Sequence, residues 1–114
     1  MSTNGWTVVD YTERLRSLAV NDARFVEKAG QDGAESPGLD PKSLTLVRLA
    51  GLVAVGGAVP SYGELSDAAV SAGASTNEIV DVLVGLIPIV GLPCVVVAAP
   101  KIALALGYDV EEEE

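Results

Sequence analysis

The chain has 114 residues, which fits one domain, and 49% of them are hydrophobic but only 4% are aromatic. A formal net charge of −9 with 7 scattered basic residues argues against nucleic-acid binding, because phosphate contacts need clustered lysine and arginine. The chain has no histidine and a single cysteine, so we expect no metal site, no cofactor, no internal disulfide and no serine–histidine catalytic triad.

The N-terminal part of the sequence predicts a helix that is broken in the middle. Residues 1–10 have no basic start followed by an apolar stretch, so we interpret them as an extension and not as a secretory signal. The segment 11–30 has apolar residues at helical spacing, and Asn21 and Asp22 predict a break, with Asp22 capping the second piece. Residues 30–38 are polar and contain glycine and proline, which indicates a loop.

Asp40 and Pro41 predict the start of the next helix. Aspartate accepts hydrogen bonds from the first free amides of a helix, and proline suits the first helical position. Apolar residues continue at helical spacing to about Val55, and Gly56 and Gly57 predict the end of this helix.

Two segments with the pattern Ser-x-x-Glu, Ser61–Glu64 and Ser75–Glu78, each predict a helix that begins with a capping box. In such a box the serine hydroxyl and the glutamate carboxylate each satisfy a free backbone amide. Between the two segments, Gly73 predicts the end of the first of these helices, because glycine readily adopts the left-handed backbone that terminates helices.

Residues 82–100 contain no charged side chain and are long enough to cross a bilayer. Three prolines and two glycines interrupt this segment, so we expect two short packed helices, the first kinked or stopped at Pro88 and the second covering about residues 93–106. We therefore predict a soluble, cytoplasmic protein without a membrane span. No segment alternates with period two, so the predicted fold class is all-α, with about five or six helices.

Four stretches of the sequence together resemble one protein family. They are Leu39-Asp40-Pro41-Lys42, Ala72-Gly73-Ala74-Ser75, Glu78-Ile79-Val80-Asp81-Val82-Leu83 and Ala103-Leu104-Ala105-Leu106-Gly107-Tyr108. Their order and spacing are similar to those of the carboxymuconolactone decarboxylase and alkylhydroperoxidase D class of bacterial proteins. The resemblance implies a compact helical domain over residues 11–109, with residues 110–114 as an acidic tail. It also implies a homo-oligomer, a trimer or a hexamer, which agrees with the many apolar residues between 79 and 106.

Peroxidase members of this class carry a glutamate, two cysteines separated by two residues, and a histidine. Counted from Gly73, the cysteine positions hold Ala58 and Ser61 and the histidine position holds Leu65; counted from Leu39, the glutamate position holds Thr45. The Cys-x-x-Cys-x-x-x-His motif is therefore absent, and we expect no thiol peroxidase activity. The one remaining route to redox chemistry is a pair of Cys94 residues between subunits.

The candidate catalytic residues are Ser61, Tyr62 and Glu64, because they lie where the active sites of the resembled class lie. In this interpretation Glu64 is a general acid or base and Tyr62 donates to a carbonyl oxygen; the alternative is that Ser61 and Glu64 only cap a helix. Arg48, on an otherwise apolar helix, either pairs with a carboxylate or binds the carboxylate of a small organic acid. We expect Cys94 to be buried as a small apolar residue.

Three functions stay open at this point. The chain is expected to be a non-redox member of the resembled class, either an oligomeric pseudoenzyme or a small-ligand-binding protein. The second is a cofactor-free decarboxylase or isomerase that acts on a small organic acid or lactone. Thiol peroxidase activity is the third, disfavoured because its motif is lost. A fold by itself cannot decide among them.

Overall fold

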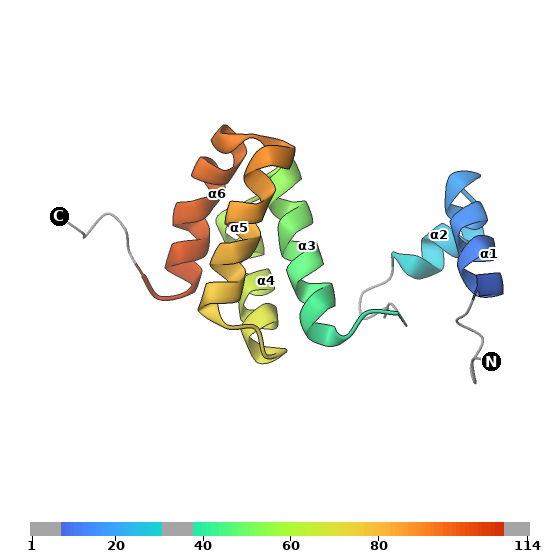
Figure 1. The fold of residues 1–114 in the computed structure, drawn as a ribbon, viewed down its shortest axis with the longest axis horizontal. Coiled ribbons are helices and arrows are strands. Elements are labelled where there is room, and N and C mark those ends of the chain that lie inside the picture. The colour runs from blue at the N-terminus through green and yellow to red at the C-terminus, as the bar shows by residue number, and fades with distance from the viewer. Residues whose placement is uncertain (1–7, 31–37, 109–114) are drawn as a thin grey trace. The chain divides into compact units, whose positions relative to one another are not determined.

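A computed structural model describes residues 8–30 and 38–108, and six α-helices and no strand occur in these ranges (Figure 1). The predicted all-α fold of five or six helices is therefore confirmed. The predicted polar loop and acidic tail and most of the predicted N-terminal extension lie outside the described residues. The chain divides into two compact units, residues 1–40 and residues 41–114, and this division falls inside the range that the sequence analysis treats as one domain.

The N-terminal unit contains α1 (Val8–Ala19) and α2 (Ala23–Ala29). The break between them lies where it was predicted: Asn21 has a positive φ of 57°, and the N–H of Asp22 donates to the Ser17 carbonyl at 2.9 Å, which closes the end of α1. The Asp22 carboxylate accepts hydrogen bonds from the N–H groups of Arg24 and Phe25, at 3.1 and 3.2 Å. The predicted cap of the second helix is therefore confirmed.

The apolar side chains of the N-terminal unit are not buried within it. Tyr11, Leu15 and Leu18 follow the spacing of one helix face, and each is more than half exposed. Among the described side chains of this unit, Ser17 is the buried one. Two short helices cannot bury enough apolar surface to form a core, so this face has no cover within its own unit.

The C-terminal unit consists of four helices, α3 (Pro41–Val55), α4 (Val59–Ser71), α5 (Thr76–Val90) and α6 (Leu92–Ala105), packed side by side (Figure 1). Helix α6 contacts each of the other three. The core residues are Leu49, Val53, Tyr62, Ala69, Ala74, Ile79, Leu83, Val95, Ala98 and Ile102. Ala69 on α4 and Ala98 on α6 are both fully buried in this core.

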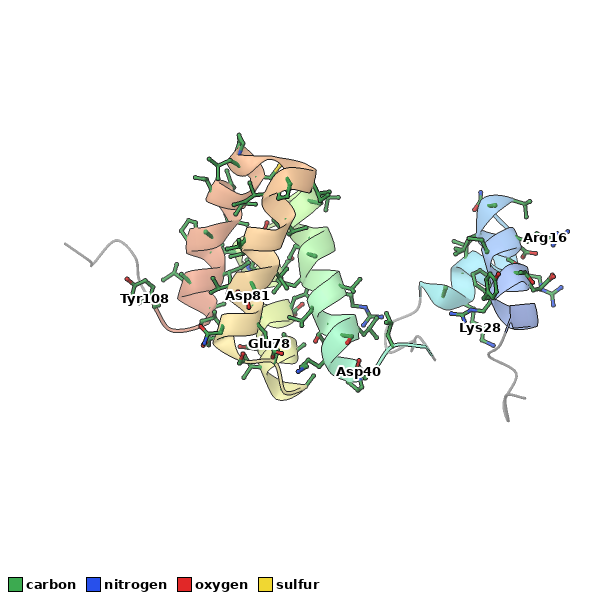
Figure 2. The ribbon with its side chains drawn as sticks, in the orientation of Figure 1. Arg16, Lys28, Asp40, Glu78, Asp81 and Tyr108 are labelled. Carbon is green, nitrogen blue, oxygen red and sulfur yellow. The ribbon has the colours of Figure 1, made fainter. Side chains whose placement is uncertain are left out.

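Two of the predicted helix starts are found in the structure. Helix α3 begins at Pro41, directly after Asp40. Helix α5 begins with the predicted capping box: the Glu78 N–H donates to Ser75 Oγ at 3.0 Å, and the Ser75 N–H donates to Glu78 Oε1 at 2.9 Å. The second carboxylate oxygen of Glu78 accepts from Lys42 Nζ at 3.0 Å (Figure 2 labels Glu78). The cap of α5 is thereby tied to the first turn of α3.

The predicted capping box at Ser61–Glu64 is wrong. Helix α4 begins at Val59, its N-cap is Ala58 and no side chain caps it, so Ser61 is already the third helical residue. The cause is Pro60, whose fixed φ and missing N–H suit the first turn of a helix and draw the helix start ahead of the serine. The N–H of Ser61 accordingly donates to the Ala58 carbonyl at 3.0 Å.

The predicted helix ends at glycine are confirmed. Gly73 and Gly107 have φ of 105° and 90°, and the residues after them donate back into α4 and α6 in the manner of a Schellman motif. Pro88 lies inside α5 and does not stop it, because the helix continues to Val90. Gly91, with φ of 93°, then separates α5 from α6. Within the described ranges, no helix is long and apolar enough to span a membrane.

Candidate functional site

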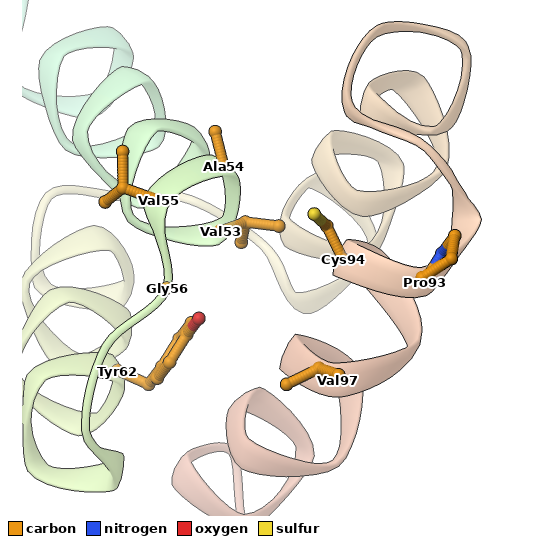
Figure 3. Close-up of a pocket in the computed structure, with 8 residues that line it drawn as sticks. All are labelled: Val53, Ala54, Val55, Gly56, Tyr62, Pro93, Cys94 and Val97. Carbon is orange, nitrogen blue, oxygen red and sulfur yellow. The ribbon is translucent and has the colours of Figure 1, made fainter.

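The C-terminal unit contains a pocket of about 280 Å³ where the last turn of α3, the first turns of α4 and the first turns of α6 meet (Figure 3). We call it the Tyr62 pocket. It is lined by Val53, Ala54, Val55, Gly56, Tyr62, Pro93, Cys94 and Val97. The side chains of this lining are apolar apart from one phenol and one thiol, and the lining contains no charged side chain.

Tyr62 is held in place by its position on α4. It is the fourth residue of this helix and only 1% exposed, and Figure 3 shows its hydroxyl directed into the space between α3 and α6. The Lys101 ammonium lies 5.6 Å from the centroid of the ring and also donates to the Gly57 carbonyl at 3.4 Å. Among the described residues, the fully buried side-chain oxygen without a hydrogen-bond partner is Ser66 Oγ and not the hydroxyl of Tyr62. The Tyr62 residue lines the pocket, where its hydroxyl can bond to water or to a ligand.

Burial raises the pKa of Tyr62 above its ordinary value, and the nearby Cys94 raises it further. Both causes disfavour the charged phenolate. The phenol therefore stays protonated at neutral pH, and it offers the pocket one O–H donor together with the acceptor lone pairs of its oxygen.

Cys94 is half-buried and not fully buried, which corrects the expectation that it is a core residue. It is the third residue of α6, and Figure 3 shows its sulfur directed toward the last turn of α3. The sequence analysis did not place it beside Tyr62. The two residues are 32 positions apart, and only the packing of α6 against α4 brings them to one pocket.

The backbone of α3 adds hydrogen-bond acceptors to this lining. The Gly56 N–H donates to the Leu52 carbonyl at 2.7 Å, but among the described residues no backbone N–H donates to the carbonyls of Val53, Ala54 or Val55. The last carbonyls of any helix lack partners within the helix. This end of α3 therefore presents partial negative charge at the pocket.

The three candidate catalytic residues do not form one site. Tyr62 lines the pocket, Ser61 is half-buried and Glu64 is exposed, and neither Ser61 nor Glu64 belongs to the lining. Two positions along an α-helix correspond to about 200° of rotation, so Tyr62 and Glu64 face away from each other. The candidate ligand-binding residue Arg48 is exposed on α3 and is not part of this pocket.

The positions that correspond to the peroxidase motif have structural roles. The Thr45 hydroxyl donates to the carbonyls of Pro41 and Lys42, at 3.1 and 2.8 Å. Ala58 is the N-cap of α4, and Leu65 packs against the core. Among the described residues, no three acidic, cysteine or histidine side chains gather in a way that could hold a metal ion.

A second pocket, of about 470 Å³, lies between α5 and α6. It is lined by Thr76, Val80, Leu83, Ala99, Ile102, Ala103, Leu106 and Tyr108. Its two hydroxyl-bearing residues, Thr76 and Tyr108, are exposed and can bond to water. The Tyr62 pocket is therefore the stronger candidate site, because its hydroxyl belongs to a buried side chain.

No protein-family model, no curated protein and no solved structure matches the chain. The chemistry of the pocket is therefore the feature that indicates a function.

Proposed function

We propose that the C-terminal unit binds a small, mostly apolar molecule in the Tyr62 pocket and does not transform it, as a non-redox relative of the class that the sequence resembles. The observation that carries this proposal is the neutral hydroxyl of the buried Tyr62 side chain, which lines an otherwise apolar pocket. A hydrogen bond between this hydroxyl and a polar group of a ligand would contribute about 0.5–1.5 kcal/mol. Apolar walls with a few placed polar groups are typical of small-molecule sites.

The size of the pocket restricts the ligand. Its volume of about 280 Å³ is roughly twice the ~150 Å³ of an engineered apolar cavity that binds benzene. It is slightly below the ~300–1,000 Å³ that pockets for drug-sized ligands occupy. We therefore propose a ligand with one ring and a short substituent.

The lining supports binding over catalysis. General acid–base catalysis at neutral pH works best with a group whose pKa lies near 7, and the pKa of Tyr62 is shifted upward from an already high value. No carboxylate or ammonium group lines the pocket to serve a decarboxylase or isomerase. A thiol peroxidase cycle within one chain needs a second thiol to resolve the sulfenic acid, and Cys94 is the one cysteine of the sequence.

We further propose that the protein self-associates, as a trimer or a hexamer. Large apolar side chains at one end of the C-terminal unit are strongly exposed, among them Val55 at 84% and Ile89 at 78%. Leu92 and Val96 on α6 are also exposed. Apolar surface of this kind usually marks an interface. Sedimentation of the protein as a monomer at micromolar concentration would contradict this proposal.

Binding is tested by titrating the full chain with toluene, benzyl alcohol and benzamide and following ligand-observed NMR. We expect saturable binding, and for benzyl alcohol and benzamide a loss of about tenfold in Tyr62→Phe, which keeps the ring and removes only the hydroxyl; tenfold corresponds to ~1.4 kcal/mol, within the range for one hydrogen bond. Toluene has no polar group, so its binding should not weaken in this variant. The control is Tyr108→Phe, which removes an exposed hydroxyl at the second pocket and should leave binding unchanged. Absence of saturable binding, or equal affinities of wild type and Tyr62→Phe for benzyl alcohol and benzamide, would refute the proposal.

A further inference from the structure

We infer that the Tyr62 pocket selects a neutral ring compound that carries a hydrogen-bond donor, such as an alcohol, a phenol or a primary amide, and discriminates against carboxylic acids. This inference rests on the proposed function and names its ligand class. It replaces the small organic acid that the sequence analysis expected as a partner.

The first reason is the set of acceptors at the end of α3. The carbonyls of Val53, Ala54 and Val55 receive no backbone hydrogen bond from the described residues, and all three residues line the pocket. The C-terminal end of a helix carries roughly half a negative charge. An O–H or N–H donor on the ligand is attracted to this wall, whereas a carboxylate is repelled by it.

The second reason is that the lining holds no cation to balance a carboxylate. The ammonium group of Lys101 is not part of the lining; it lies over the Tyr62 ring and donates to the Gly57 carbonyl. Transfer of an unpaired carboxylate into an apolar site costs far more than transfer of a neutral polar group. The net charge of −9 adds a general repulsion of anions.

The start of α6 also lies at the pocket, and helix N-termini attract anions. Pro93, the second residue of α6, has no N–H to offer, which reduces that attraction, whereas the missing side-chain cap leaves the other N–H groups of the first turn without a side-chain acceptor. The discrimination against carboxylates therefore depends on the α3 carbonyls and on a lining without charged side chains.

Tyr62 completes the recognition of a neutral donor. Because its pKa is raised, the phenol is protonated and can donate to the ligand oxygen that itself donates to an α3 carbonyl. We expect one hydroxyl group on the ligand to accept from Tyr62 and to donate to one of these carbonyls. A carboxylate can accept from Tyr62 but has no proton for the carbonyls.

The test compares benzyl alcohol, benzamide, benzoate and toluene with the full chain at pH 7, by calorimetry or ligand-observed NMR. We expect both neutral donors to bind at least about tenfold more tightly than benzoate, and more tightly than toluene. Benzoate binding as tightly as benzamide would overturn the inference and leave the proposed function standing. If none of the four compounds binds, the proposed function itself fails.

A charge-reversing variant gives an independent readout of the same site. Val55→Lys places a cation at the rim of the pocket, at a position that is 84% exposed in the single chain, so the fold should tolerate it. Because Val55 also belongs to the surface proposed for self-association, sedimentation of the variant is compared with that of wild type before binding is measured. We expect this variant to bind benzoate at least about tenfold more tightly than wild type does. The matched control is Val70→Lys, on an exposed position of α4 outside the pocket. An equal gain in both variants would show that overall charge, not the pocket, sets the preference, and would overturn the inference.

Discussion

The two Ser-x-x-Glu segments of the C-terminal unit look alike in sequence and differ in structure. Ser75 and Glu78 form a complete capping box at the start of α5, whereas Ser61 and Glu64 lie inside α4, which starts at Val59 without a side-chain cap. The difference arises from the residue before each serine: Pro60 favours the first turn of a helix and shifts the start forward. A capping pattern therefore predicts a helix start only when the residues before it do not begin the helix themselves.

Aligned by helix position and not by motif, the two helix starts become equivalent. Ala58 then corresponds to Ser75, and Tyr62 corresponds to Ile79, the fourth residue of its helix. Tyr62 is 1% exposed and Ile79 is fully buried. The shift by three residues thus decides that Tyr62 points into the unit and becomes part of a pocket.

The alignment is tested most strongly by replacing the two equivalent residues, Tyr62 and Ile79, with alanine. Tyr62→Ala and Ile79→Ala should each lower the free energy of unfolding by about 2–5 kcal/mol, because each removes a large buried side chain from the core. Chemical denaturation followed by circular dichroism measures both. A loss below about 1 kcal/mol for Tyr62→Ala, with a large loss for Ile79→Ala, would break the equivalence.

The two serines give a smaller and more selective effect. Ser75→Ala removes the hydroxyl that caps α5 and should cost about 1 kcal/mol of stability. Ser61→Ala removes a hydroxyl that caps nothing and should stay within about 0.5 kcal/mol of wild type. Thermal unfolding of the two variants side by side measures the contrast. Equal losses would mean that the serine of α4 stabilises its helix start after all.

The smallest expected effect concerns the two glutamates and depends on pH. The Ser75 N–H and the Lys42 ammonium hold the pKa of Glu78 below its ordinary value of 4.5. Because the folded state lowers this pKa, the stabilisation is present above pH 4.5 and is lost as the pH falls through the folded value. Glu78→Gln should therefore flatten the acid side of the stability profile, measured as melting temperature against pH.

Glu64→Gln serves as the matched control for that profile, since Glu64 is exposed on α4 and lies outside any capping box. Its profile should follow wild type. If both variants flatten the profile alike, then overall negative charge and not the cap of α5 explains the acid sensitivity.

Much of the fold could be predicted from the sequence because its signals are local. Asp22, Pro41, Ser75 and Gly73 each fix a helix boundary through contacts with residues at most five positions away. The start of α4 was missed because two local signals competed, and the propensity of Pro60 for the first turn prevailed over the serine pattern.

The pocket could not be predicted in the same way. Tyr62 was identified as a candidate through the resemblance, but its partners there, Cys94 and the last turn of α3, come from helices distant in sequence. The sequence contains no local pattern that predicts contact between the end of α3 and the start of α6. The packing of helices that are distant in sequence decides it, and this packing depends on the residues at their contacts.

Ser66, one helical turn beyond Tyr62, is fully buried, and its hydroxyl has no hydrogen-bond partner. A serine there forgoes stability that an alanine of nearly the same size would provide, because the methyl group needs no partner. Ser66→Ala is therefore expected to stabilise the protein. Such substitutions are common because selection maintains stability above a threshold and does not maximise it. The stability gained at this position could offset destabilising substitutions around the pocket, and the lining of the pocket would stay unchanged.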